Sequence, residues 1–125
     1  FMSKRTRKLI TLDLEKYTYT EEVVGKKFYG QGYFSRAWGQ PDQNLIGPTR
    51  KVHYFTEDGA LQNGIYARYN DGTYTTMFQA IKGGIHKWDE TIGIALSPDN
   101  SKFYAGFQSL GYIFEIMRDG GLPFE

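Results

Sequence analysis

The chain has 125 residues, enough for one small domain with an ordinary hydrophobic core. Its formal charge of +1 excludes the strongly basic surface of a dedicated nucleic-acid-binding protein, and its lack of cysteine excludes disulfides, thiolate metal sites and cysteine nucleophiles. No apolar run approaches the roughly 18 residues that a membrane-spanning helix needs, so neither a nucleic-acid partner nor a membrane span is expected.

The composition favours an all-β fold, because ten Tyr and nine Phe suit half-buried strands and fifteen Gly suit the tight turns between them. Residues 9–14 alternate in the manner of a half-buried strand, and residues 17–24 are rich in Tyr, Thr and Val. The two segments together predict a β-hairpin. Residues 25–48 are rich in Gly and aromatic residues without a clean period, and they predict a long loop with one short strand near 44–46.

Six further strands are expected in the rest of the chain. They cover residues 50–56, 64–69, 73–79, 92–96, 102–107 and 111–117. Asn70-Asp71-Gly72 is a hairpin signal because these residue types tolerate the positive φ of tight turns. Ser97-Pro98-Asp99-Asn100 likewise places Pro and Asx residues where turns favour them. No segment has a convincing helical period.

The sequence also repeats itself. Asp42 and Asp89 are 47 residues apart, as are Gly64 and Gly111, and an aromatic strand between them repeats with a spacing four residues longer. Repeats of roughly 40 to 50 residues made of short strands are typical of β-propellers, whose blades are four-stranded antiparallel sheets. We therefore interpret the chain as a partial β-propeller with antiparallel blades of up to four strands.

This interpretation divides the chain into three units. Residues 1–39 supply the outer strands of one blade plus a connecting loop, 40–86 the middle blade, and 87–125 a third blade that lacks its outermost strand. Closed propellers use about four to eight blades, so about two and a half blades do not close a ring. The expected partners are the remaining blades of a longer chain, or other protein chains that pair with its open sheet edges. The alternative fold is an ordinary small β-sandwich.

Three acidic motifs stand out in the second and third units. They are Glu57-Asp58-Gly59 after an aromatic strand, Asp89-Glu90 before an apolar one, and Arg118-Asp119-Gly120 after the last one. Together with the Ser-Pro-Asp-Asn turn, they resemble blades of the PhoX-type alkaline phosphatase-like β-propeller family over residues 40–124. The resemblance implies a secreted or periplasmic propeller in which carboxylates at one end of the central channel hold metal ions. The enzymatic members of that family hydrolyse phosphate esters.

On this resemblance, Glu57 is the best match to a channel carboxylate, and Asp89 and Glu90 are the other candidate metal ligands. Calcium is the expected ion, because it binds several hard oxygen ligands and carboxylates from successive blades can supply them. Metal ions held in this way can polarise a phosphoryl oxygen. Enzymatic members use an iron site that includes a cysteine, which this chain lacks. No catalytic residue is therefore assigned within it.

Three functions remain open at this point. The first is a PhoX-like propeller segment that is non-catalytic alone and acts as a structural or interaction module, which the missing cysteine favours. The second is part of a calcium-dependent phosphoesterase whose site is completed by further blades, which the acidic motifs favour. The third is a small β-sandwich that binds a ligand or a sugar through surface aromatic residues. Whether the parent protein is an enzyme stays undecided.

Overall fold

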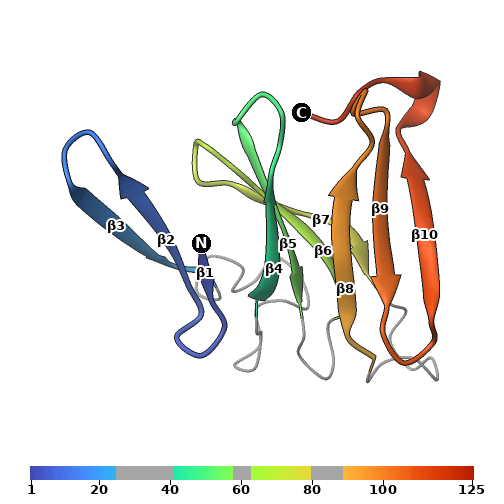
Figure 1. Ribbon diagram of the computed structural model, residues 1–125, viewed down its shortest axis with the longest axis horizontal. Helices are drawn as coiled ribbons and strands as arrows, with labels where there is room; N and C mark the ends of the chain where they lie inside the picture. Colours follow the sequence, from blue (N-terminus) through green and yellow to red (C-terminus); the bar gives the residue numbers. More distant parts are fainter. Residues whose placement is uncertain (25–40, 58–62, 80–88) are drawn as a thin grey trace.

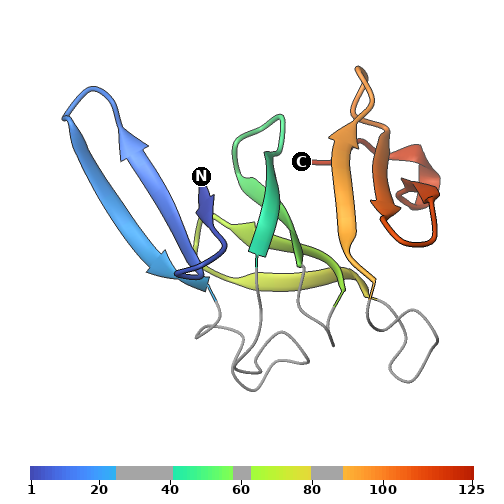
Figure 2. The same ribbon diagram turned by 60° about the horizontal axis from the view of Figure 1, so that its bottom comes forward.

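The computed structural model describes residues 1–24, 41–57, 63–79 and 89–125, and within these ranges it is built from β-strands. Three antiparallel sheets of three, four and three strands stand side by side in the order of the sequence (Figures 1 and 2). The all-β prediction is confirmed. The described residues contain no helix that is long and apolar enough to cross a membrane.

The N-terminal sheet has the predicted hairpin and one additional strand. Its strands are β1 (Met2–Ser3), β2 (Lys8–Asp13) and β3 (Thr18–Val23), with β2 in the centre. The Asp13 carboxylate closes the β2–β3 turn by accepting hydrogen bonds from the backbone N–H groups of Glu15 and Lys16 at 3.1 and 3.0 Å. β1 was not predicted, because so short a strand shows no alternating pattern.

The middle sheet is a four-stranded meander. Its strands are β4 (Pro41–Ile46), β5 (Val52–Glu57), β6 (Gly64–Tyr69) and β7 (Tyr74–Gln79), paired in chain order. The strand expected near 44–46 is longer than predicted. The Thr56 hydroxyl accepts a hydrogen bond from the backbone N–H of Gln43 at 3.0 Å, which keeps the irregular first half of β4 in the sheet across a bulge. The rest of the predicted loop, 25–40, lies outside the described residues.

The C-terminal sheet has three strands. They are β8 (Thr91–Leu96), β9 (Lys102–Phe107) and β10 (Tyr112–Met117), and a 3-10 turn at Asp119–Gly121 follows them. The predicted β8–β9 turn is held by the Asp99 carboxylate, which accepts hydrogen bonds from the hydroxyl groups of Ser97 and Ser101 at 2.6 and 2.9 Å. Asn100 takes the positive φ of 60° that the turn requires. The three strands predicted for this part of the chain are confirmed.

The strand registers define the repeat more accurately than the sequence does. The first residue of β4 pairs with the last residue of β5, Pro41 with Glu57, and the same pairing in the C-terminal sheet joins Thr91 to Phe107. A register shift follows in both β4 and β8. Pro41 is therefore equivalent to Thr91 and Glu57 to Phe107, and both pairs have the same separation along the chain. That separation is longer than the one between Asp42 and Asp89.

The third strands repeat with a slightly shorter separation than the first two. Gly64 of β6 pairs with the last residue of β5, and Tyr112 of β10 pairs with the last residue of β9, so Gly64 is equivalent to Tyr112. The alignment of Asp42 with Asp89 from the sequence is thus wrong. Asp42 lies inside β4, whereas Asp89 lies before β8 starts. The two aspartates have different roles, and their separation along the chain is close to the repeat length only by coincidence.

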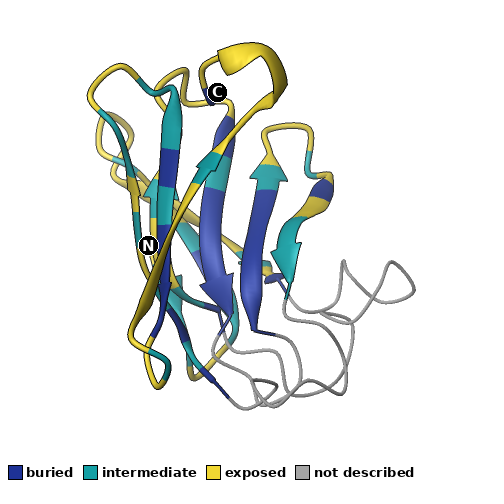
Figure 3. Cartoon of the chain, turned by 90° about the vertical axis from the view of Figure 1, so that its right-hand side faces the viewer, coloured by how far each residue is buried: buried dark blue, intermediate teal, exposed yellow. Residues whose placement is uncertain are grey.

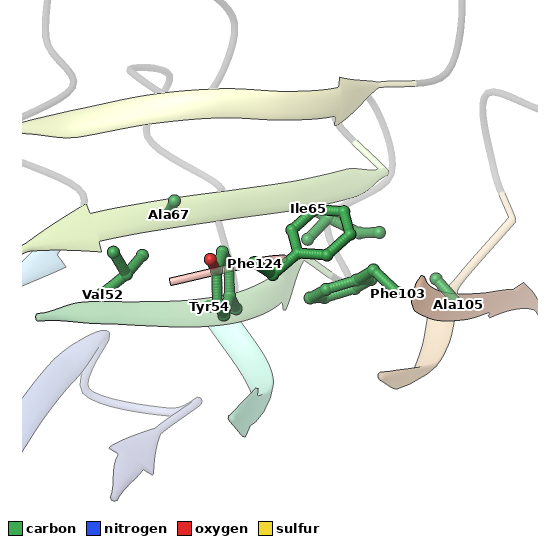
Figure 4. Close-up of a cluster of buried hydrophobic side chains, with 7 residues drawn as sticks. All are labelled: Val52, Tyr54, Ile65, Ala67, Phe103, Ala105 and Phe124. Atoms are coloured by element: carbon green, nitrogen blue, oxygen red, sulfur yellow. The ribbon is translucent and has the colours of Figure 1, made fainter. Parts of the chain in front are cut away.

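The central strands of the middle sheet, β5 and β6, are buried on both faces, because their side chains alternate between two hydrophobic clusters. The cluster toward the N-terminal sheet contains Leu9, Val24, Phe55, Tyr66 and Tyr74. The cluster toward the C-terminal sheet contains Val52, Tyr54, Ile65, Ala67, Phe103, Ala105 and Phe124 (Figure 4). Aromatic rings carry much of the second contact, since the ring centroids of Tyr54 and Phe103 are 5.2 Å apart in an edge-to-face arrangement.

The first strands of the middle and C-terminal sheets lie beside each other (Figure 1). The backbone N–H of Gly93 in the β8 bulge donates a hydrogen bond of 2.6 Å to the side-chain oxygen of Gln43 in the β4 bulge. Gly93 adopts a φ of +64° there, a conformation that residues with a Cβ rarely adopt. The bulges thus help to set how one sheet follows the next.

Candidate functional site

The three predicted metal ligands lie at the same end of the sheets. Glu57 is the last residue of β5, and Asp89 and Glu90 come directly before β8, all at the lower end in Figure 1. Glu57 is fully buried and Asp89 nearly so. Within residues 1–24, 41–57, 63–79 and 89–125, however, no three His, Asp or Glu side chains form a group that could hold a metal ion. The residues as they lie here do not compose a calcium site, and the calcium ligands stay a prediction.

Asp89 has a structural role at this end of the sheet. Its carboxylate accepts hydrogen bonds from the backbone N–H groups of Ser109 at 2.7 Å, Glu90 at 2.9 Å and Leu110 at 3.2 Å. Burial raises the pKa of the Asp89 carboxyl group, but these hydrogen bonds outweigh it and hold the pKa below its usual value. Asp89 therefore ties the entry of β8 to the β9–β10 turn.

A polar cluster that the sequence did not predict joins the N-terminal and middle sheets. The Arg68 guanidinium donates to both carboxylate oxygens of Glu22, with Nε 3.0 Å from each and a terminal nitrogen 2.7 Å from Oε2. The Tyr74 hydroxyl donates to the same carboxylate. The hydrogen bond to Glu22 raises the pKa of Arg68, and burial is the main cause that raises the pKa of Tyr74. The cluster fixes how two sheets lie together, and its side chains do not form a nucleophile–base pair.

A groove of about 590 Å³ lies between β2 and the middle sheet. It is lined by Leu9, Thr11, Ile46, Gly47, Pro48, Arg50, Val52, His53, Arg68 and Asn70. Burial, the N-terminal ammonium group and Arg68 lower the pKa of His53 to about 4, so its imidazole is neutral at pH 7. The His53 Nε2 atom lies 3.2 Å from the Asn44 side-chain oxygen, which orients the ring through an amide instead of a carboxylate.

The outward face of the C-terminal sheet is exposed. We call it the C-terminal face, and it comprises Lys102, Tyr104, Ile113, Glu115 and Met117. These residues alternate with Phe103, Ala105 and Ile116, which pack against the middle sheet. Ile113 is 80% exposed and Met117 61% exposed, and the strand that leads into the 3-10 turn is coloured as exposed along most of its length (Figure 3).

The outward face of the N-terminal sheet is similar in character. We call it the N-terminal face, and it comprises Lys8, Ile10, Leu12, Tyr19, Glu21 and Val23. They alternate with Leu9 and Glu22, which contact the middle sheet. Leu12 is 54% exposed and its cross-strand neighbour Tyr19 is 64% exposed. Each end of the sheet array thus presents large apolar side chains to solvent.

Comparison with known proteins found no relative. No protein-family model matches the sequence, no curated protein matches it, and no solved structure matches the fold. The resemblance to PhoX-type propellers thus rests on the sequence motifs alone.

Proposed function

We propose that the chain is a segment of a β-propeller of the PhoX-like type, and that it acts as a non-catalytic structural or interaction module. The observation that carries this proposal is the middle sheet, which has four strands and is covered on both faces by neighbouring sheets. Stacking of successive sheets on both faces of a blade is what a propeller requires, whereas a two-sheet sandwich buries one face of each sheet.

The direction of the strands supports the same proposal. β2 points in the same general direction as β4 and β8 in Figure 1, although it is inclined to them, so it corresponds to a first or a third blade strand. Because β1 flanks β2 on one side and β3 on the other, the N-terminal sheet corresponds to the second, third and fourth strands of a blade. The C-terminal sheet corresponds to the first three. The terminal sheets are then incomplete blades, which makes them the natural sites of interaction with other sheets.

Truncation of one core side chain on each side of the middle sheet tests this arrangement. Phe55 packs toward the N-terminal sheet and Phe103 packs on the middle sheet from the other side, and both are fully buried. We expect Phe55→Ala and Phe103→Ala each to lower the free energy of unfolding by about 3–5 kcal/mol, measured by urea denaturation. If either variant is as stable as the wild type, the middle sheet has only one covered face and the propeller proposal fails.

Calcium-binding and activity assays distinguish the proposed non-catalytic module from the alternative function, a calcium-dependent phosphoesterase. Calorimetric titration with calcium chloride should give no binding at the carboxylates of Glu57, Asp89 and Glu90 in the isolated chain, and p-nitrophenyl phosphate should not be hydrolysed. The reason is that the described residues form no cluster of three metal-binding side chains. Calcium binding that is lost in Glu57→Gln, accompanied by calcium-dependent hydrolysis, would favour the enzyme instead.

A further inference from the structure

Besides having one strand fewer than the middle sheet, each terminal sheet has an outward face that none of the described residues covers. On the middle sheet, Tyr54 and Ile65 point toward the next sheet and are nearly or fully buried there. The shared strand register places Tyr104 and Ile113 at the equivalent positions of the C-terminal sheet. The C-terminal face therefore presents side chains at positions that, one repeat earlier, contact a following sheet.

The opposite end of the array presents a surface suited to a preceding sheet, the N-terminal face. In the middle sheet, Phe55 and Tyr66 point backward and are buried against the preceding sheet. The backward-pointing side chains of the N-terminal sheet include Leu12 and Tyr19, which pair across β2 and β3 and are exposed. One chain thus carries both a face suited to a following sheet and a face suited to a preceding sheet.

From these two faces we propose that the C-terminal face of one copy packs against the N-terminal face of a second copy. This inference rests on the proposed propeller architecture and names the partner of its terminal sheets. A head-to-tail contact of this kind joins two different surfaces, so it forms rings when the rotation closes. Each copy contributes three sheets, and a pair of copies then falls within the range of about four to eight that closed propellers use.

The chemistry of the two faces predicts a reversible association. Each face combines exposed apolar side chains with one ion pair, Lys102–Glu115 at 3.1 Å on the C-terminal face and Lys8–Glu21 on the N-terminal face. The equivalent positions of Lys102 and Glu115 on the middle sheet are Val52 and Ala67, which are buried. A surface with this mixture resembles a non-obligate interface more than a domain core. The monomer is therefore expected to stay folded when dilute, and the dimer to form as the protein concentration rises.

Complementation between two surface variants tests the head-to-tail contact. Analytical ultracentrifugation of the 125-residue chain over a range from roughly 1 to 200 μM should show a monomer–dimer equilibrium. Ile113→Lys and Leu12→Lys should each weaken dimerisation at least tenfold, because each places a charge in the interface of the homodimer. An equimolar mixture of the two should form heterodimers joined through the one interface that contains no substitution, and these should form at lower concentration than either homodimer, in which every interface carries a lysine. Tyr17→Lys, at a residue that is 93% exposed in the β2–β3 turn, serves as a control that should leave dimerisation unchanged.

Three results would overturn the inference. The first is a chain that stays monomeric throughout the concentration range. The second is a dimer that Ile113→Lys abolishes and Leu12→Lys leaves intact, which indicates pairing of two C-terminal sheets, for example through the edge of β10. The third is a mixture that does not recover heterodimers. Met117→Lys provides a second variant of the C-terminal face should Ile113→Lys alter the circular-dichroism spectrum. None of these results tests the proposed propeller architecture, which is tested separately by the unfolding of the Phe55→Ala and Phe103→Ala monomers.

Discussion

The middle and C-terminal sheets share a strand register but differ in what covers them. Both begin with a bulged strand and continue as an antiparallel meander with equivalent pairings. Ile65 is fully buried in one, while Ile113 at the equivalent position of the other is 80% exposed. The local sequence therefore specifies the strands of both sheets equally well. Whether a strand face belongs to a core or to a surface is decided by the neighbouring sheet.

The largest expected effect tests this difference directly. Ile65→Ala should lower the free energy of unfolding by about 2–5 kcal/mol, because it removes buried methyl groups and leaves a cavity between two sheets. Ile113→Ala removes the same atoms from an exposed position, and it should change the stability by less than about 0.5 kcal/mol. Urea unfolding of both variants at a protein concentration where the chain is monomeric measures the contrast. Equal losses in the two variants would mean that the C-terminal face is already covered in the monomer.

A second pair of equivalent positions predicts a pH effect. His53 in β5 corresponds to Phe103 in β9, so the same backward-facing position is titratable in one sheet and apolar in the other. The pKa of His53 is lowered from its ordinary value of 6.5 to about 4, mainly by burial. Protonation therefore favours the unfolded state. The stability contributed by the neutral imidazole is fully present above about pH 6.5 and declines as the pH falls toward 4.

The variant His53→Phe should remove this part of the pH dependence. Between pH 7 and pH 4 the wild type should lose about 2 kcal/mol more stability than the variant, a value reduced for the partial exposure of the imidazole. Carboxylates elsewhere titrate equally in both proteins, so they do not contribute to this difference. Urea unfolding at several pH values measures the difference between the two curves. Parallel curves would show that His53 is solvated in the folded protein and that its position between the sheets is not as described.

The sequence predicted the strands well because they depend on local patterns. Alternation and aromatic content located the β2–β3 hairpin and the strands of the C-terminal sheet, and the turn signals at Asp71 and Asp99 are the residues whose carboxylates hold those turns. The sequence missed β1, which is too short for a pattern, and it shortened β4, whose irregular half depends on a hydrogen bond to Thr56 on another strand. Strand existence is a local property, whereas strand length at a bulge is not.

The contacts between sheets could not be predicted in the same way. Glu22 and Arg68 are far apart in the sequence, and nothing in either segment indicates that a bidentate ion pair joins them. The exposure of the C-terminal face could not be predicted from the sequence either, because Ile113 lies in an apolar strand whose pattern is typical of a buried strand. The acidic motifs show the same limit. Their positions place Glu57, Asp89 and Glu90 at one end of the sheets, but the distances that a metal site needs depend on how the sheets stack.

The smallest expected effect separates two aspartates that the sequence alone makes look equivalent. Asp89→Asn keeps the shape and one oxygen acceptor but removes the charge that three backbone N–H groups face, so it should lower stability by about 1–2 kcal/mol at pH 7. Because the pKa of Asp89 is lowered in the folded state, the wild-type advantage is present above the unfolded-state pKa of about 3.9 and is lost as the pH falls below it.

Asp42→Asn is the matched control. The Asp42 carboxylate forms a partly exposed ion pair with the Lys4 ammonium group at 3.5 Å. Within the described residues it faces no set of backbone donors comparable to that of Asp89. Such pairs contribute little, so this variant should lose less than about 0.5 kcal/mol. Urea unfolding at pH 7 and pH 3 measures both variants side by side. If the two substitutions cost the same stability at pH 7, the hydrogen bonds of the Asp89 carboxylate do not hold β8 to the β9–β10 turn as described. If only the Asp89 substitution lowers stability, the aspartate before β8 acts by tying the strand to the β9–β10 turn.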